Sequence, residues 1–462
     1  MMNRETSKPP SALPAPPARP SLAEALAAAT DTRDLRMGSG VVQRVAETFH
    51  LQFPGEKALV ICDPVTWSVA GEAAHRELHL AGLASTPPYV LADPGLFAEH
   101  RFVEELEPAL RASGAVAVAV GSGTINDLVK LASHRVGRPY LCVATAASMD
   151  GYTAFGASIT HRGAKQTFSC PAPRAVVADL DILRRAPPAM TASGYADLQA
   201  KITAGADWLL AQALGVEPVD PRAWAIVQGG LREALADPAG ARRGDASAIG
   251  ALAEGLMLGG FAMQWARSSR PASGAEHQFS HLWDMEHHTH LGSAPSHGFK
   301  VGIGTLAITS LYEELLELPL ESLDVERCVA GWPDWPAVEA DVLRRFAHDD
   351  FAATALEETS AKLVSREELR EQLARLAGSW PVLRETLRAQ LLPLAELRRR
   401  LELVGAPTQP SQIGLSAERL REAFHRAYFI RRRFTVLDLA VRTRTLEPSL
   451  EALFGPGGAW SH

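Results

Sequence analysis

The chain has 462 residues, which is too long for one ordinary hydrophobic core and predicts two domains. Apolar residues make up 47% and charged residues 21%, the balance of a soluble globular protein. The formal net charge of -7 disfavours nucleic acid as a partner, because nucleic-acid binders usually present a basic face.

The four cysteines are scattered without CxxC spacing, so neither a disulfide framework nor a thiolate zinc site is expected. This usage fits a reducing compartment, and we expect a cytoplasmic protein. The sequence lacks a window close to 18 uninterrupted apolar residues, so no membrane-spanning helix and no membrane partner are expected. The N-terminus also lacks the charged-then-apolar layout of a signal peptide.

Near the N-terminus the sequence reads PPSALPAPPARPS, in which proline blocks both helices and sheet ladders. We therefore predict a disordered lead over residues 1–24, with the fold starting near Ser21. From about residue 57 to residue 180 the sequence alternates short apolar runs with turn signals and helical segments. They predict an α/β domain over residues 25–186.

Three apolar runs, KALVIC (57–62), AVAVAV (115–120) and YLCVAT (140–145), are typical of strands that helices bury on both faces in a parallel sheet. Each run ends in turn residues: Asp63-Pro64, GSGTIND and TAASMDG. In open α/β sheets the carboxyl ends of the strands are where ligands bind.

After the sequence Ala-Pro-Pro at 186–188, strand-like runs nearly vanish. Long helical patterns cover 194–214, 248–266 and 366–404. We therefore predict a helical domain over residues 187–462.

The glycine-rich turn GSGTIND (121–127) follows a strand and opens a helix. Its glycines let backbone N–H groups approach a phosphate, and the helix N-terminus favours the negative charge. The pattern is neither GxGxxG nor a P-loop, so a purely structural turn is the alternative. Asp63 can accept hydrogen bonds from ribose hydroxyls and would repel a 2′-phosphate, or it can simply begin a turn before proline.

Histidines cluster in the second domain. His277 and His281 lie four residues apart in SGAEHQFSH, so on a helix they share a face on which either could meet a metal. Sixteen residues further, His297 lies between small residues. Three more histidines crowd the same region, so spacing alone does not decide which of them bind a metal: His287, His288 and His290. The alternative is imidazoles that bind no metal.

Asp197 lies early in an apolar helical pattern. One carboxylate with two imidazoles is a common ligand set for a divalent metal that keeps open positions. Lys201, four residues later, either pairs with Asp197 or offers a cation to a substrate phosphate, for which Lys165 is a second candidate.

Five motifs occur in an order that resembles the sn-glycerol-1-phosphate dehydrogenase family, within the superfamily of iron-type alcohol dehydrogenases and dehydroquinate synthases. The resemblance covers roughly residues 35–310, with a weaker echo at RRRFTVLDLA (431–440). It implies a dehydroquinate synthase-like fold: an α/β nucleotide-binding domain with a parallel sheet, followed by an all-α metal-binding domain. The motifs are GSGTIND (121–127), TAASMDG (145–151), GYADLQAK (194–201), SGAEHQFSH (273–281) and SHGFK (296–300).

The resemblance implies roles for particular residues. Asp197, His277 and His297 hold one divalent metal (zinc, nickel or iron), and His287, His288 and His290 are set aside. His281 and Asp150 act in catalysis, and together with Asp197 they contact the substrate. The implied contacts to NAD(P) are Asp63, Gly121, Ser122, Gly123, Thr124, Ile125, Thr145, Ala146, Ala147 and Ser148.

Two features depart from the family pattern. Ala154 stands where many relatives place a serine that contacts the cofactor. The chain also continues for about 150 residues past SHGFK, a C-terminal extension that could change oligomerisation or substrate access. Because the family tends to assemble, a homodimer is a further expectation.

The activity implied by the resemblance is hydride transfer between NAD(P)H and a polyol phosphate, with dihydroxyacetone phosphate and sn-glycerol 1-phosphate as the pair. One alternative is a carbocycle-forming lyase like dehydroquinate synthase, in which NAD is recycled. That family typically uses a glutamate where this chain has Asp197. Another alternative is a non-enzymatic scaffold or nucleotide sensor, which the presence of every expected metal ligand disfavours.

Overall fold

The computed structural model describes residues 20–461 except 86 and 162–163. Residues 1–19 of the predicted lead lie outside the described residues. Helix α1 (Leu22–Ala28) begins inside the range predicted for the lead, because the Ser21 hydroxyl accepts the Glu24 N–H and the Glu24 carboxylate accepts the Ser21 N–H.

A parallel six-stranded sheet forms the first half of the molecule, in the order β1-β8-β5-β4-β2-β3. The three predicted apolar runs become β2, β4 and β5, which are neighbours in the sheet and are buried along their whole length. The parallel sheet is therefore confirmed. The strands are β1 (Asp34–Gly38), β2 (Ala58–Cys62), β3 (Tyr89–Val90), β4 (Val116–Gly121), β5 (Tyr140–Ala144) and β8 (Ala175–Asp179).

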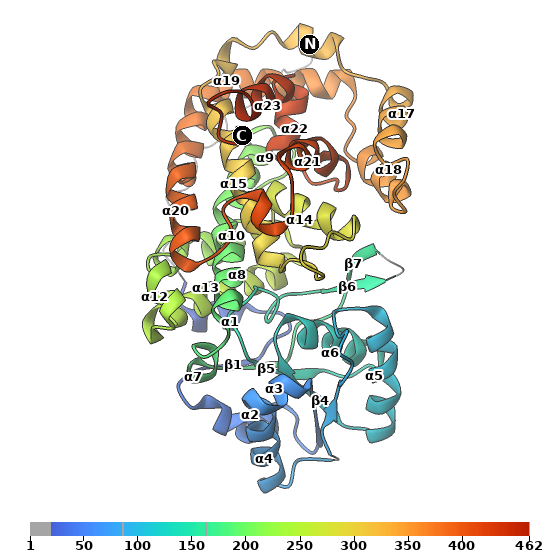
Figure 1. Ribbon diagram of the computed structural model, residues 1–462, viewed down its shortest axis with the longest axis vertical. Coiled ribbons are helices and arrows are strands. Elements are labelled where there is room, and N and C mark those ends of the chain that lie inside the picture. Colours follow the sequence, from blue (N-terminus) through green and yellow to red (C-terminus); the bar gives the residue numbers. More distant parts are fainter. Residues whose placement is uncertain (1–19, 86, 162–163, 462) are drawn as a thin grey trace, which may run out of the picture.

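Helices cover both faces of the sheet, as Figure 1 shows in blue and teal. On one face α2 (Val45–Gln52) and α4 (Glu72–Leu80) pack against strand residues such as Val60 and Val118. On the other face α5 (His100–Ser113) and α6 (Gly123–Arg135) pack against the alternate residues such as Leu59 and Ala117. Strands with both faces covered in this way read as continuous apolar runs.

A short antiparallel hairpin, β6 (Ala157–His161) and β7 (Ala164–Phe168), leaves the sheet half, and β7 contacts the helical half at α14. After α7 (Leu180–Leu183) the described residues contain helices and no further strand. This change of character agrees with the predicted helical second part.

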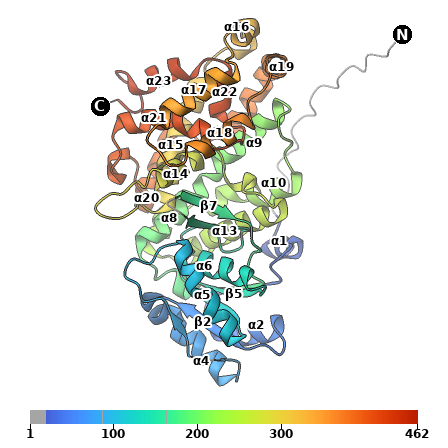
Figure 2. The same cartoon turned by 90° about the vertical axis from the view of Figure 1, so that its right-hand side faces the viewer.

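The second half is a helical assembly, drawn in green to red in Figures 1 and 2. The helices that follow one another first are α8 (Pro188–Gln199), α9 (Lys201–Ala213), α10 (Pro221–Gln228), α11 (Leu231–Ala234), α12 (Pro238–Arg243), α13 (Ala246–Ala266), α14 (Ala275–Met285) and α15 (His297–Leu316). The C-terminal extension adds α16 (Val325–Ala330), α17 (Trp335–Arg345), α18 (Ala352–Ser360), α19 (Arg366–Gln390), α20 (Leu394–Val404), α21 (Ala417–Phe429), α22 (Val436–Arg442) and α23 (Leu446–Phe454).

Helix α13 is long and apolar enough to cross a membrane by length and composition, the one such helix in the described part of the chain. Within its most apolar window 67% of the residues are buried inside the protein. It packs against α1, α8, α10 and α12, and a helix that is apolar on all sides is typical of a protein core.

Candidate metal centre

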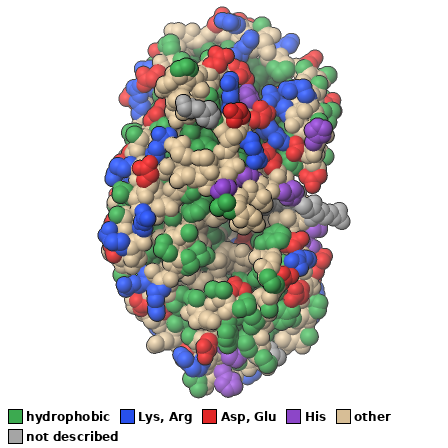
Figure 3. All heavy atoms as spheres, viewed as in Figure 1, with side chains coloured by type: hydrophobic (Ala, Val, Ile, Leu, Met, Phe, Trp, Pro, Cys, Tyr) green, Lys and Arg blue, Asp and Glu red, His purple; other side chains and the backbone are tan. Residues whose placement is uncertain are grey.

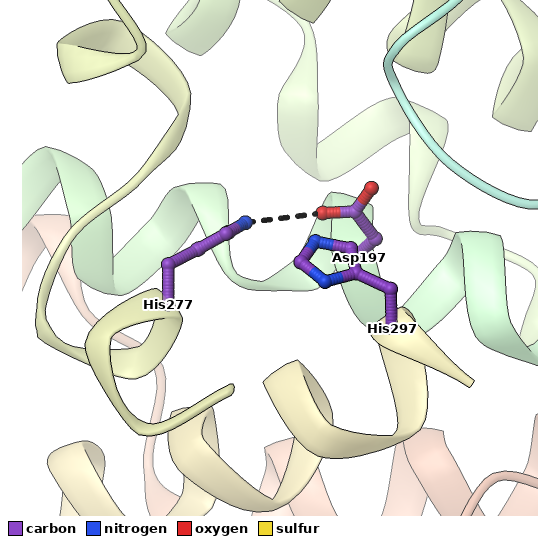
Figure 4. Close-up of side chains that lie close together, drawn as sticks. All are labelled: Asp197, His277 and His297. Carbon is purple, nitrogen blue, oxygen red and sulfur yellow. Dashed lines mark ion pairs between the residues drawn. The ribbon is translucent and has the colours of Figure 1, made fainter. Parts of the chain in front are cut away.

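Three helices bring the predicted metal ligands together. Asp197 lies near the end of α8, His277 in the first turn of α14, and His297 is the first residue of α15. Helix α15 packs against both α8 and α14, so side chains that are up to 100 residues apart in the sequence meet. Figure 4 shows the three side chains pointing toward one another.

The ligand atoms of Asp197, His277 and His297 all lie within 4.8 Å of one another. Nε2 of His277 is 3.5 Å from Oδ1 of Asp197, and the rings of His277 and His297 are 5.4 Å apart. Among the described residues this is the one group of three potential ligands that converges in this way. Of the histidines that the sequence left open, His287, His288 and His290 do not join it.

Two glycines of α15 allow this close approach. A Cβ on Gly298, next to His297, would lie 1.9 Å from the carbonyl oxygen of Ser193 on α8. A Cβ on Gly304 would lie 2.5 Å from the carbonyl oxygen of Glu276 on α14. Since real Cβ atoms do not approach backbone atoms so closely, any side chain at these positions would push the ligand-bearing helices apart.

Hydrogen bonds orient both imidazoles. Nδ1 of His277 lies 2.8 Å from the Glu276 carboxylate, which can only accept, so Nδ1 donates and Nε2 is left for a metal. Nδ1 of His297 lies 3.2 Å from the Ser280 hydroxyl. The sequence analysis assigned no role to Glu276 or Ser280. For Glu276 the sequence does carry a signal, because this carboxylate comes directly before His277 in SGAEHQFSH.

Lys201 connects two carboxylates of the site. Its buried Nζ lies 2.7 Å from Asp197 and 2.7 Å from Asp150. Burial alone would lower the pKa of Lys201, but the charges of Asp150 and Asp197 outweigh it and raise that pKa. Likewise burial opposes ionisation of Asp197, but Lys201 and then His277 lower the pKa of Asp197 overall. The pairing with Asp197 is therefore the role that the geometry gives to Lys201, and its ammonium is not presented to a substrate phosphate.

Asp150 and His281, the predicted catalytic residues, lie beside this group. The backbone N–H of Asp150 donates to Asp197 at 3.1 Å, and the Asp150 side chain is 15% exposed. Burial, and next the charge of Asp197, raise the pKa of Asp150. The half-buried His281 ring lies 6.4 Å from the ring of His277 and 6.2 Å from that of His297. Figure 3 shows histidine side chains near the middle of this face, close to where the two halves meet.

The predicted nucleotide contacts lie at one edge of the sheet. Asp63, the segment Gly121–Ile125 and the segment Thr145–Ser148 follow the neighbouring strands β2, β4 and β5 at their carboxyl ends. Strand order reverses between β2 and β4, and such a switch point is where open α/β sheets bind ligands. A Cβ on Gly121 would lie 2.5 Å from Ile125, so this turn requires glycine.

Helix α6 begins at Gly123, directly after this turn, and its first N–H groups have no partner within the helix. The segment Thr145–Ser148 contacts both this turn and helix α8, which carries Asp197. Thr145 donates to the Gly121 carbonyl at 3.2 Å, and a Cβ on Gly194 of α8 would lie 1.9 Å from the Ala147 carbonyl oxygen. The nucleotide edge and the helix that carries Asp197 are thus in direct contact.

A buried lysine that the sequence analysis passed over fixes the loop that carries Asp150. Lys130 of α6 donates to three backbone carbonyls, those of Gly151, Ala154 and Gly156, at 2.9–3.0 Å. Ala154, noted above as a departure from the family, is buried and contributes its carbonyl here. The ammonium has its three donors satisfied, so Lys130 acts on the loop and not on a ligand.

Asp63 caps the helix that follows β2. Its Oδ1 accepts the N–H groups of Val65 and Thr66, both at 2.8 Å. The turn-initiating role that the sequence left open is therefore present. Its position at the carboxyl end of β2 still leaves the second carboxylate oxygen for a ribose hydroxyl.

The residues present fit the groups that the family implies. One carboxylate and one imidazole that are buried, with a second imidazole that is half-buried, converge within 4.8 Å and match the donor set of a divalent transition metal. A glycine turn before a helix N-terminus, where a side chain at Gly121 would collide with Ile125, matches a pyrophosphate site.

The fold places the chain in a class of proteins. The family described as iron-containing alcohol dehydrogenase matches residues 36–187. A probable glycerol dehydrogenase from Sinorhizobium meliloti 1021 superposes with a TM-score of 0.57 at 15% identity, over 90% of this chain and 96% of that one. A sulfoacetaldehyde reductase from Bifidobacterium kashiwanohense, solved in complex with NAD+, superposes with a TM-score of 0.54 at 15% identity, over 91% of this chain and 98% of that one. The fold is that of the iron-type alcohol dehydrogenases.

Sequence relatives narrow the class. A protein of Halalkalibacterium halodurans named glycerol-1-phosphate dehydrogenase (NAD(P)+) is 33% identical over 300 residues, which cover 63% of this chain and 74% of the relative. A Pyrococcus horikoshii protein of the same name is 32% identical over 285 residues, which cover 61% of this chain and 78% of the relative. A Geobacillus thermodenitrificans protein of that name is 29% identical over 386 residues, which cover 83% of this chain and 86% of the relative. The chain belongs to the glycerol-1-phosphate dehydrogenase family.

Proposed function

We propose that this chain is a metal-dependent dehydrogenase that transfers a hydride between NAD(P)H and a polyol phosphate, with dihydroxyacetone phosphate and sn-glycerol 1-phosphate as the substrate pair. The observation that carries the proposal is the convergence of Asp197, His277 and His297 beside the nucleotide edge of the sheet. The relatives that carry this activity in their names support the choice of substrate.

In this proposal Asp197, His277 and His297 hold the metal. When bound, the divalent metal supplies Lewis acidity toward a substrate oxygen, and the nicotinamide supplies or accepts the hydride. The hydrogen bonds from His277 to Glu276 and between His297 and Ser280 fix both rings, so the site is organised before a ligand arrives.

Asp150 and His281 serve the substrate hydroxyls. Asp150 is tied to Asp197 by its own N–H and to Lys201 by its carboxylate, so its position relative to the metal ligands is fixed. Its exposed 15% gives a hydroxyl access to one side of the carboxylate. We assign proton exchange with the substrate oxygen to the His281 imidazole, which shares a helix face with His277.

The Gly121–Ile125 turn and the Thr145–Ser148 segment bind the pyrophosphate and nicotinamide ends of the cofactor. The backbone N–H groups at the start of α6 bind the phosphates. The turn before this helix needs glycine at Gly121, because a Cβ there would collide with Ile125. Asp63 accepts from a ribose hydroxyl, and its charge favours NAD over NADP.

The substrate phosphate needs a cation. Lys201 is withdrawn from this role because Asp150 and Asp197 occupy its ammonium in a buried position. The side chain of Lys165, the other candidate, lies outside the described residues and remains a candidate. Turnover of glycerol compared with glycerol 1-phosphate measures how much the phosphate contributes.

The test is metal analysis of purified protein combined with an NAD(P)H-linked assay on dihydroxyacetone phosphate. His277→Ala should lose bound metal and lower kcat/KM by about a thousandfold or more, several kcal/mol of transition-state stabilisation. His348→Ala, at an exposed histidine of the C-terminal extension, is the matched control and should leave both unchanged. A His277→Ala protein with normal metal content and turnover would show that the ligand assignment is wrong.

The same assay addresses the lyase alternative, because a dehydrogenase consumes NAD(P)H in proportion to product whereas a recycled cofactor shows no net change. A cytoplasmic location and a homodimer stay predictions. Fractionation and sedimentation of the native protein test them.

A further inference from the structure

A buried carboxylate outside the ligand set joins three distant segments. Asp207 of α9 is fully buried, and its Oδ2 accepts the N–H of Ala275, the first residue of α14, at 2.7 Å. Its Oδ1 accepts the Tyr312 hydroxyl of α15 at 2.6 Å and the Val436 N–H at 2.8 Å. Val436 belongs to the C-terminal extension and is the first residue of α22.

Two arginines bind the same part of the extension to the start of α14. Arg270 donates to the carbonyls of Phe434 and Asp207, each at 3.1 Å. Arg433 donates to the Ser273 carbonyl at 2.6 Å. Residues 433–436 are therefore attached to the short segment that leads directly into Glu276 and His277.

The far end of α14 is attached to the extension as well. Glu286, just after the helix, accepts hydrogen bonds from Arg419, at 2.8 Å, and from Arg426, both on α21. His288 contacts the Ile413 carbonyl at 2.6 Å. Helix α14, which carries His277 and His281, is thus held at both ends by residues 413–436.

We propose that the C-terminal extension is an outer scaffold of the metal centre, in which the Val436 N–H acts through Asp207 to fix the start of α14 and the direction of His277. Asp207 and Val436 are positioning residues in this proposal and touch neither metal nor substrate. The inference rests on the proposed metal site. Its physical basis is that a buried carboxylate deprived of one of its donors moves toward other partners, and Asp207 shares its carboxylate with Ala275.

Val436→Pro removes the donor and puts the proline Cδ where the amide hydrogen lay, so Oδ1 of Asp207, 2.8 Å from that nitrogen, must move away from Val436. Proline is favoured at the first position of a helix, and it lacks the N–H. The preceding residue, Thr435, has φ -144 and ψ -179, an extended conformation that proline accepts in its neighbour. Val436→Ala is the matched control, because it shortens the same buried side chain and keeps the N–H.

The measurement is the dissociation constant for Zn2+ in the full-length protein, by competition with a chromogenic chelator, together with the unfolding temperature of the metal-free form. Val436→Pro should weaken Zn2+ binding by about tenfold, and Val436→Ala should lower the unfolding temperature with an unchanged dissociation constant. Equal Zn2+ affinity in Val436→Pro and the wild type would overturn the inference, and so would an equal loss in both variants.

Asp207→Asn provides a second route if Val436→Pro does not fold. The asparagine amide cannot accept on both sides, so either Ala275 or the pair Tyr312 and Val436 loses its acceptor, and Zn2+ affinity should fall by a similar factor. Unchanged affinity in a folded Asp207→Asn protein would also overturn the inference. A wild-type protein that binds none of Zn2+, Ni2+ and Fe2+ would instead contradict the proposed function, so the two failures are distinct.

Discussion

Glu276→Gln isolates the charge of the carboxylate that orients His277. Oε1 of Glu276 receives the Gly274 N–H at 2.6 Å and Nδ1 of His277 at 2.8 Å, while Oε2 receives the Thr203 hydroxyl at 2.9 Å. A glutamine can keep its amide oxygen at the first position and donate to Thr203 from the second. The Thr203 hydroxyl already lies 3.0 Å from the Ala200 carbonyl, to which it can then donate.

The substitution therefore keeps every hydrogen bond and removes the charge. Hydrogen bonds to charged groups contribute about 1.5–3 kcal/mol and neutral ones about 0.5–1.5 kcal/mol, so the bond to His277 weakens by roughly 1–1.5 kcal/mol. A less firmly held and less basic imidazole should raise the metal dissociation constant by about tenfold, within the range of about 10–100-fold for partners of metal ligands.

Chelator competition with Zn2+ measures this change. Glu47→Gln is the control, because the exposed Glu47 pairs with Arg44 at α2, in the sheet half and outside both the ligand set and the C-terminal extension. It should bind Zn2+ as the wild type does. If Glu276→Gln also binds Zn2+ with wild-type affinity, the carboxylate has no influence on the metal and the role given to Glu276 is wrong.

Three further outcomes are expected. Gly298→Ala should destabilise the fold by more than the roughly 1–3 kcal/mol of ordinary overpacking and should lower the metal content, because its Cβ would lie 1.9 Å from the Ser193 carbonyl oxygen. Gly378→Ala is the control: its Cβ would meet open space, so its thermal unfolding should match that of the wild type. The four cysteines are buried, and burial raises the pKa of Cys170 to about 11, so Ellman's reagent should label the native protein slowly and the denatured protein fully; fast native labelling would contradict this burial. Burial, and next the charge of Glu276, raise the pKa of Asp207 to about 7, so its proton is bound more tightly in the folded protein and its stabilising contribution is lost as the pH rises from about 4 to 7. Urea titration of the metal-free protein should show Asp207→Asn gaining about 3 kcal/mol relative to the wild type between pH 5 and pH 8, and a constant difference would refute that pKa.

Much of the sheet could be predicted because its central strands are continuous apolar runs. β2, β4 and β5 are buried on both faces, and that requirement appears directly in the sequence. β8 (AVVAD) carries the same signal and was passed over. β1 (DLRMG) carries almost none, because it lies at the edge of the sheet and is only partly buried.

The ligand set could not be read from spacing. Nothing in the pattern of His277, His281, His287, His288 and His290 says which rings meet Asp197, because the answer depends on how three helices pack. The family resemblance selected the two rings that the packing of α8, α14 and α15 places beside Asp197. The outer contacts were invisible for the same reason: Val436 reaches Asp207 across 229 residues through a backbone N–H, which no side-chain motif records.

The charges around the ligands give an independent reason for a divalent cation. Asp150, Asp197 and Glu276 place three carboxylates in a buried space, and within the described part of the chain Lys201 is the ammonium that pairs with two of them. Three carboxylates against one ammonium leave an excess of negative charge, which is costly to bury. A divalent metal held by Asp197, His277 and His297 would offset this excess without a further side chain, while Lys201 stays engaged by Asp150 and Asp197.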